Sequence, residues 1–103
     1  MTSYITLASR TSPTLMPLTR DPDRAVTAFV FSNSDDALAF ANQHLQHYDD
    51  EWITNTHDKI SMGAWLKSCI ENDNVTQIAI NPNSGNPVVV PIDVFLKVVR
   101  TSQ

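Results

Sequence analysis

Residues 25–31 carry the clearest hydrophobic pattern of the chain. In an extended strand alternate side chains face opposite sides. One side would carry Val26, Ala28 and Val30, and the other Thr27, Phe29 and Phe31. Because both sides are largely apolar, this pattern is typical of a strand that other elements cover on both faces. The run therefore predicts a central strand of a sheet.

Two further apolar runs, residues 75–80 and residues 88–90, lie close together in the sequence. Residues 81–87 between them are rich in Asn and Pro, which favour turns, so the pattern predicts two strands joined by a turn. Pro91 follows directly. A proline at the first helical position loses no hydrogen bond, so we expect Pro91 to begin a last helix. That helix would be lined by Ile92, Phe95, Leu96 and Val99.

Helical spacing predicts two more helices. The first would have Ser34 as its N-cap, Asp35 and Asp36 in its first turn, and its end at residues 49–51. Its apolar stripe would consist of Leu38, Ala41, Leu45 and Tyr48, widened by Ala37, Phe40 and His44. The second would cover residues 61–72 and bury Met62, Trp65, Leu66, Cys69 and Ile70 on one face.

The remaining segments are less regular. Residues 4–8 are compatible with a short strand, so residues 1–13 are either a loose arm or an edge strand. Pro17 restricts residues 15–19 to the edge of a sheet. Residues 52–56 have the composition of another strand. We expect one α+β domain over residues 1–103, with a mixed sheet of four to five strands and about three helices.

Composition and charge narrow the classes of partner. The chain has 103 residues, 7 Lys and Arg, 11 Asp and Glu, and a net charge of −4. Its cations are scattered, so it lacks the basic patch that nucleic acid or an anionic membrane attracts. No segment approaches the ~20 apolar residues of a membrane span. Cys69 is the single cysteine and excludes an intrachain disulfide. We expect a cytoplasmic protein that binds neither nucleic acid nor membrane.

Few residues are candidates for catalysis or metal binding. His44 and His47 lie three residues apart, a spacing that can place two imidazoles on one helix face beside a metal, with His57 nearby in the sequence. Their alternative role is that of a solvated polar helix end, and whether the three histidines meet is left open. Cys69 with a histidine could form a nucleophile and base, but it lies on a predicted apolar face. We expect no catalytic residues, no metal and no cofactor.

A candidate interaction or ligand surface combines an aromatic pair with a polar turn. Tyr48 and Trp52 flank an acidic run, and an exposed Trp would mark a contact surface. A Trp folded over the end of the sheet is the alternative. In the polar turn, Asn81 would cap the end of the strand and Pro82 would pre-set the turn. The full set of candidate residues is Tyr48, Trp52, Asn81, Pro82 and Asn83.

Residues 29–41, Phe-Val-Phe-Ser-Asn-Ser-Asp-Asp-Ala-Leu-Ala-Phe-Ala, carry a family resemblance together with Ile78-Ala-Ile-Asn-Pro82 and Val90-Pro-Ile-Asp-Val-Phe-Leu96. A strand, an acidic cap, a helix with Ala-x-x-Phe, and a later strand that ends in Asn-Pro resemble the SseB-like N-terminal domain, over residues 14–100. That family is linked by name to enhanced serine sensitivity and loosely to secretion-system proteins. The resemblance implies the α+β fold, and it supplies no catalytic residues.

These observations favour a non-enzymatic adaptor domain that binds an unidentified protein or a second copy of itself as a homodimer. A small-ligand or peptide sensor is the first alternative, with a pocket at the turn of residues 81–86 and an anion at the start of the last helix. A small metal- or cysteine-dependent enzyme is the second alternative.

Overall fold

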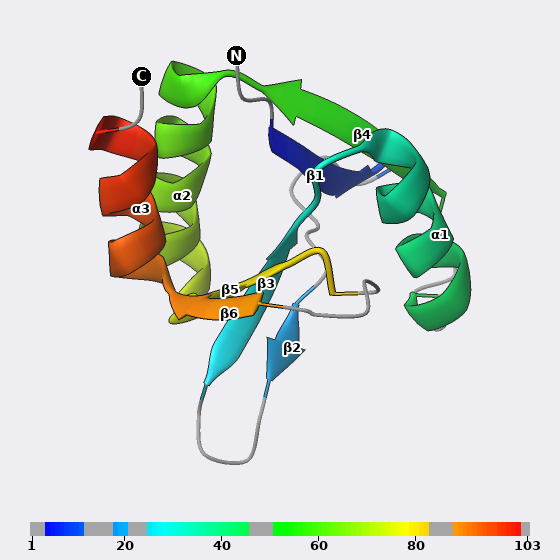
Figure 1. Cartoon of the computed structure of the whole chain (residues 1–103). Helices are drawn as coiled ribbons and strands as arrows, with labels where there is room; N and C mark the ends of the chain where they lie inside the picture. The colour runs from blue at the N-terminus through cyan, green and yellow to red at the C-terminus, as the bar shows by residue number, and fades with distance from the viewer. Residues whose placement is uncertain (1–3, 12–17, 21–24, 46–50, 83–87, 102–103) are drawn as a thin grey trace.

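The structure is a computed structural model of the chain, and it describes residues 4–11, 18–20, 25–45, 51–82 and 88–101. Figure 1 shows the arrangement of its elements. In chain order these are β1 (Tyr4–Ser9), β2 (Thr19–Arg20), β3 (Val26–Val30), α1 (Ser34–His44), β4 (Trp52–His57), α2 (Lys59–Asp73), β5 (Gln77–Ile80), β6 (Val88–Pro91) and α3 (Ile92–Thr101).

The described strands form two sheets. A four-stranded sheet has the order β2-β3-β5-β6, in which β3 and β5 are parallel and the other pairs are antiparallel. Strands β1 and β4 form a separate antiparallel pair. Ile5 of β1 exchanges two backbone hydrogen bonds with Phe31, 2.9 and 2.8 Å long, which joins this pair to the end of β3. The α+β class, the mixed sheet and the three helices are as predicted, and residues 4–9 are a strand rather than a loose arm.

Helices α2 and α3 lie side by side and cover one face of the four-stranded sheet (Figure 1). The predicted apolar stripe of α2 places Met62, Leu66 and Cys69 at 0% exposure. These residues join a core cluster with Val26, Ala28, Val30, Val75, Ile78, Ile92, Phe95 and Val99. Apolar side chains recur every 3.6 residues along the helices and every two residues along β3. These two sets of side chains pack against each other in one core layer.

Helix α1 packs on the β1–β4 pair and on the opposite side of β3 (Figure 1). The ring of Phe40 lies 4.7 Å from that of Phe29 and 5.5 Å from that of Phe31, measured between centroids. The second core cluster consists of Ile5, Leu7, Phe31, Ala37, Phe40, Ala41 and Leu45. Since β3 contributes to one cluster and borders the other, the prediction that it is covered on both faces is confirmed.

The predicted ends of three elements were wrong by a few residues. Asn33, not Ser34, caps α1, because its Oδ1 accepts a hydrogen bond from the Asp36 N–H at 2.8 Å. Helix α1 ends at His44 rather than at residues 49–51. Asp58 caps α2 two residues earlier than expected. Pro91 ends β6 opposite Gln77 instead of beginning α3.

Three described residues of the predicted helical stripes are exposed, namely His44 and the two aliphatic residues Leu38 and Ile70. Leu38 of α1 is 39% exposed and Ile70 of α2 is 37% exposed. Both were expected on a core face, but each helix contacts its sheet through a narrower stripe than the sequence suggests. Among the described helices, none has the length and apolar content that a membrane crossing requires.

Candidate functional site

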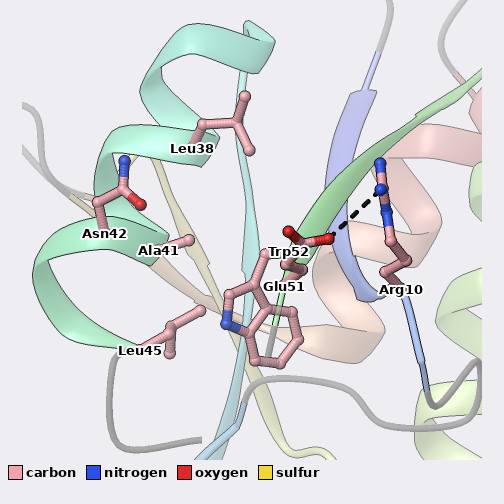
Figure 2. A pocket seen from close by; sticks show the side chains of 7 residues that line it. All are labelled: Arg10, Leu38, Ala41, Asn42, Leu45, Glu51 and Trp52. Atoms are coloured by element: carbon pink, nitrogen blue, oxygen red, sulfur yellow. Dashed lines mark ion pairs between the residues drawn. The ribbon is translucent and has the colours of Figure 1, made fainter. Parts of the chain in front are cut away.

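A hollow of about 360 Å³ lies between α1 and the start of β4, and Figure 2 shows its side chains. It is lined by Arg10, Leu38, Ala41, Asn42, Leu45, Glu51 and Trp52. The lining combines aliphatic groups, one amide, one aromatic ring and two opposite charges. We call it the α1–β4 hollow.

Helical and strand periods bring these side chains together. Residues 38, 41, 42 and 45 recur at the spacing of one helix face, so α1 presents them to the same neighbour. Trp52 pairs with Ser9 and shares its side of the strand pair with Leu7, a member of the second core cluster. The indole is consequently half-buried, with Leu45 and Ala41 of α1 beside it (Figure 2).

An ion pair stands at the rim of the hollow. Arg10 Nη1 lies 3.3 Å from Glu51 Oε2, and the two side chains are 65% and 72% exposed. The backbone N–H of Arg10 also donates to the Glu51 carbonyl at 2.8 Å, which fixes the two residues opposite each other. An exposed ion pair contributes at most about 1 kcal/mol to stability. The site therefore offers an apolar floor and a rim on which both charges face solvent.

Three of the five predicted surface residues, Trp52, Asn81 and Pro82, lie in the described part of the chain, and of these Trp52 lines the hollow. Asn81 and Pro82 are half-buried and do not line it. Tyr48 and Asn83 lie outside the described residues. Trp52 packs against the second cluster and also borders the hollow.

Asn81 has a structural role at the end of β5. Its Oδ1 accepts from the Ser32 N–H at 2.9 Å, and its Nδ2 donates to Ser32 Oγ at 2.8 Å. Its backbone φ of 48° is in the left-handed region, which Asn tolerates better than most residues. This matches the prediction that Asn81 caps the strand. The side-chain amide of Asn81, which a ligand at this turn would need, is already hydrogen-bonded to Ser32, close to the end of β3.

The histidines do not converge in the described part of the chain. His44 is exposed and its ring lies 4.8 Å from that of Phe40. His57 is the last residue of β4, with Nε2 2.9 Å from Thr6 Oγ1 and Nδ1 2.7 Å from Ser61 Oγ. His47 lies outside the described residues, and the described residues contain no group of three His, Cys, Asp or Glu that could hold a metal.

Cys69 is buried among the apolar residues of the first core cluster. Burial raises the pKa of its thiol to about 12, and the nearby Asp73 carboxylate adds to the increase. The nucleophilic form of a cysteine is the thiolate. At neutral pH this environment keeps Cys69 as a thiol.

Sequence reasoning missed six of the described residues that line the hollow: Arg10, Leu38, Ala41, Asn42, Leu45 and Glu51. Leu38 was assigned to the core, and Glu51 to a helix end. Arg10 and Glu51 are far apart in the sequence and meet only through the β1–β4 register. No local pattern signals that register.

Lowering the pH from about 7 to about 5 should reduce the free energy of unfolding through His57. Burial lowers the pKa of His57 below 6.5, although the charge of Asp58 opposes the shift. The unfolded chain then binds a proton that the folded chain resists, so stability is lost as the pH falls below 6.5. Urea denaturation at several pH values should show this slope. In His57→Gln the slope should flatten, whereas in His44→Gln it should persist; an unchanged slope in His57→Gln would contradict the assignment.

The sequence itself was compared with known proteins. No family model matches the chain, and no curated protein matches it. The SseB-like resemblance stays a prediction, so the function has to be inferred from the geometry of the α1–β4 hollow.

Proposed function

We propose that this chain is a non-enzymatic binding domain that receives a short segment of a partner protein in the α1–β4 hollow. The observation that carries the proposal is the half-buried Trp52 beside Leu38, with the Arg10–Glu51 ion pair at the rim. An aliphatic or aromatic side chain of the partner would contact Trp52 and Leu38. Charged groups next to it would contact Arg10 and Glu51.

The size and chemistry of the hollow support this role. A volume of about 360 Å³ falls in the range of sites that take one large side chain or a small molecule. Trp and Arg are the residues that most often dominate the binding energy of protein interfaces. The presence of both residue types at one concave site supports a binding role more strongly than the exposure of a single side chain would.

The rim favours a segment that carries charge. Because the Arg10–Glu51 pair is exposed, its mutual attraction is weak and a ligand charge can replace either partner at little cost. Such a rim tolerates a carboxylate beside Arg10 or an amine beside Glu51. A partner segment with an apolar residue flanked by charges of both signs would pair with Arg10 and with Glu51 at the same time.

The resemblance to the SseB-like N-terminal domain is compatible with the same proposal, since it supplies no catalytic residues. The raised pKa of Cys69 and the separation of His44 from His57 give no support to the enzyme alternative. A small-molecule sensor is the second candidate, because the hollow is also large enough for a free amino acid.

The experiment uses Trp52 as the reporter. The chain has two Trp residues, so a Trp65→Phe background leaves Trp52 as the single source of indole fluorescence. Peptides with a central Leu, Phe or Trp and acidic, basic or mixed flanks are titrated, together with the free amino acids. Saturable changes with peptides alone support a protein partner, whereas saturation with free amino acids supports the sensor. No change with any probe contradicts both.

Leu38→Glu should weaken the binding of the best peptide at least about tenfold, since it removes an apolar wall and adds a second carboxylate to the hollow that Glu51 also lines. Ile70→Glu is the matched control, because Ile70 is also a helical aliphatic residue at 37% exposure but does not line the hollow. Equal losses in the two variants would assign the effect to stability rather than to the site.

A further inference from the structure

Another hollow, of about 250 Å³, lies beside the start of α2 and the end of α3. Figure 1 shows the two helices side by side and antiparallel, so that the last turn of α3 lies next to the first turns of α2. We call this space the α2–α3 hollow. It is lined by Lys59, Ile60, Gly63, Ala64, Lys67 and Arg100. None of these residues lines the α1–β4 hollow.

The helical period gives α2 an outer face in addition to its buried stripe. Residues 60, 63, 64 and 67 recur at spacings of three and four, so they lie on one side of the helix. The buried residues Met62, Leu66 and Cys69 lie on a different side and belong to the first core cluster. The wall that α2 gives to the hollow is therefore separate from the part of the helix that holds the fold together.

The apolar part of this wall is open to solvent. Ile60 is 83% exposed, the highest value among the large hydrophobic residues of the described chain. A Cβ atom at Gly63 would meet no atom within 4 Å, so the space beside its backbone is open. A single exposed aliphatic side chain is ordinary at a protein surface. Ile60 differs from that case because it borders a concave space that cations surround.

The charges around the hollow have one sign. Its described lining contains three cations, Lys59, Lys67 and Arg100, and no acid. They are three of the seven Lys and Arg residues of a chain whose net charge is −4. Within the described part of the chain, none of the three forms an ion pair. Like charges around one small space repel each other, and an anion between them replaces this repulsion with attraction.

We propose that the α2–α3 hollow binds a small organic anion with a short apolar body, such as an aliphatic carboxylate or an alkyl phosphate. The anionic head would lie among Lys59, Lys67 and Arg100, and the aliphatic part would contact Ile60 beside Gly63. A volume of about 250 Å³ is below the range of sites for drug-sized ligands, so the hollow suits a head group and a few carbon atoms.

This site is distinct from the one on which the proposed function rests. The rim of the α1–β4 hollow carries Arg10 and Glu51 and so offers both signs of charge. The α2–α3 hollow offers cations alone among its described lining residues, which selects for anions. The inference stands or fails independently of a partner segment at Trp52.

The first test is a titration of the isotope-labelled full chain, followed by the backbone amide signals of Gly63 and Ala64. The probes are hexanoate, hexyl phosphate, hexanol and inorganic phosphate. Hexanoate and hexyl phosphate should saturate with dissociation constants of about 1 mM, a strength compatible with so few atoms. Hexanol lacks the charge and inorganic phosphate lacks the chain, so each should bind at least about tenfold more weakly.

The four probes separate the two halves of the proposal. The tighter of the two hexyl anions identifies the preferred head group. If hexanol binds as tightly as the hexyl anions, the cations have no role, and if inorganic phosphate does, the apolar wall has none. Either result would overturn the proposal, as would amide signals of Gly63 and Ala64 that none of the probes shifts.

Gly63→Leu closes the hollow without changing its charge. The added side chain would occupy the open space at Gly63, and leucine favours a helix more than glycine does, so the variant should stay folded. Binding of hexanoate should fall at least about tenfold. Ser68→Leu, at an exposed position of α2 outside the hollow, is the control and should bind like the wild-type chain. Unchanged binding in Gly63→Leu, or equal losses in both variants, would contradict the site.

Lys67→Gln tests the cations without changing the shape of the hollow greatly. Removing one exposed charge should weaken hexanoate binding about two- to fivefold. Lys97→Gln is the matched control, because Lys97 is also an exposed helical lysine but does not line the hollow. Raising the salt concentration from about 0.1 M to about 1 M should also weaken binding to the wild-type chain, since exposed charges are then screened. Equal binding by Lys67→Gln and Lys97→Gln, or binding that salt leaves unchanged, would count against an anion among these cations.

Discussion

Leu66→Ala should lower the free energy of unfolding by about 2–5 kcal/mol, the usual cost of truncating a buried leucine. Leu66 is 0% exposed and lies in the first core cluster, where α2 meets the four-stranded sheet. Removing three carbon atoms from this layer loses apolar burial and leaves a cavity that the neighbours fill only in part. Because a whole domain is typically stable by about 5–15 kcal/mol, the effect is a large fraction of the total.

Urea denaturation followed by far-UV circular dichroism measures this change. Lys67→Ala on the same helix is the control, since Lys67 is exposed and the substitution should change stability by less than about 0.5 kcal/mol. If Leu66→Ala were as stable as the control, α2 would not be a core helix. Its apolar face would then be a candidate partner surface.

Phe31→Ala should cost about 3–5 kcal/mol, the range for a buried aromatic ring. Phe31 is 1% exposed, contacts the ring of Phe40, and bonds through its backbone to Ile5. It thus holds the β1–β4 pair and α1 against the end of β3. Val89→Ala is the comparison, because Val89 is a strand residue at 53% exposure and should lose less than about 1 kcal/mol.

The two core variants together test whether the chain folds as one unit. Leu66 and Phe31 belong to different clusters that share β3 as a boundary. If both clusters unfold together, each variant should show one transition by circular dichroism and by Trp fluorescence. The losses of Leu66→Ala and Phe31→Ala should then add within about 0.5 kcal/mol. Two separated transitions would show that the β1–β4 unit unfolds independently.

The sequence alone determined the elements whose pattern is local. Both faces of β3, the buried stripe of α2, the β5–β6 hairpin and the apolar line of α3 follow from periods of two and 3.6 residues. The N-cap of α1 was predicted one residue too late, at Ser34 instead of Asn33, because Asn and Ser near a helix start compete for the same role. The capping role of Asn81 was also predicted, although its partner Ser32 was not.

Only the tertiary structure decided how β1 meets β4, and with it the candidate site. Arg10 and Glu51 are opposite each other because of a pairing between segments distant in sequence, for which neither segment carries a register signal. The same pairing turns Trp52 toward α1 and leaves Leu38 beside it at the surface. A hydrophobic period specifies which side of an element is buried, but the element that covers it is chosen by packing across the whole chain.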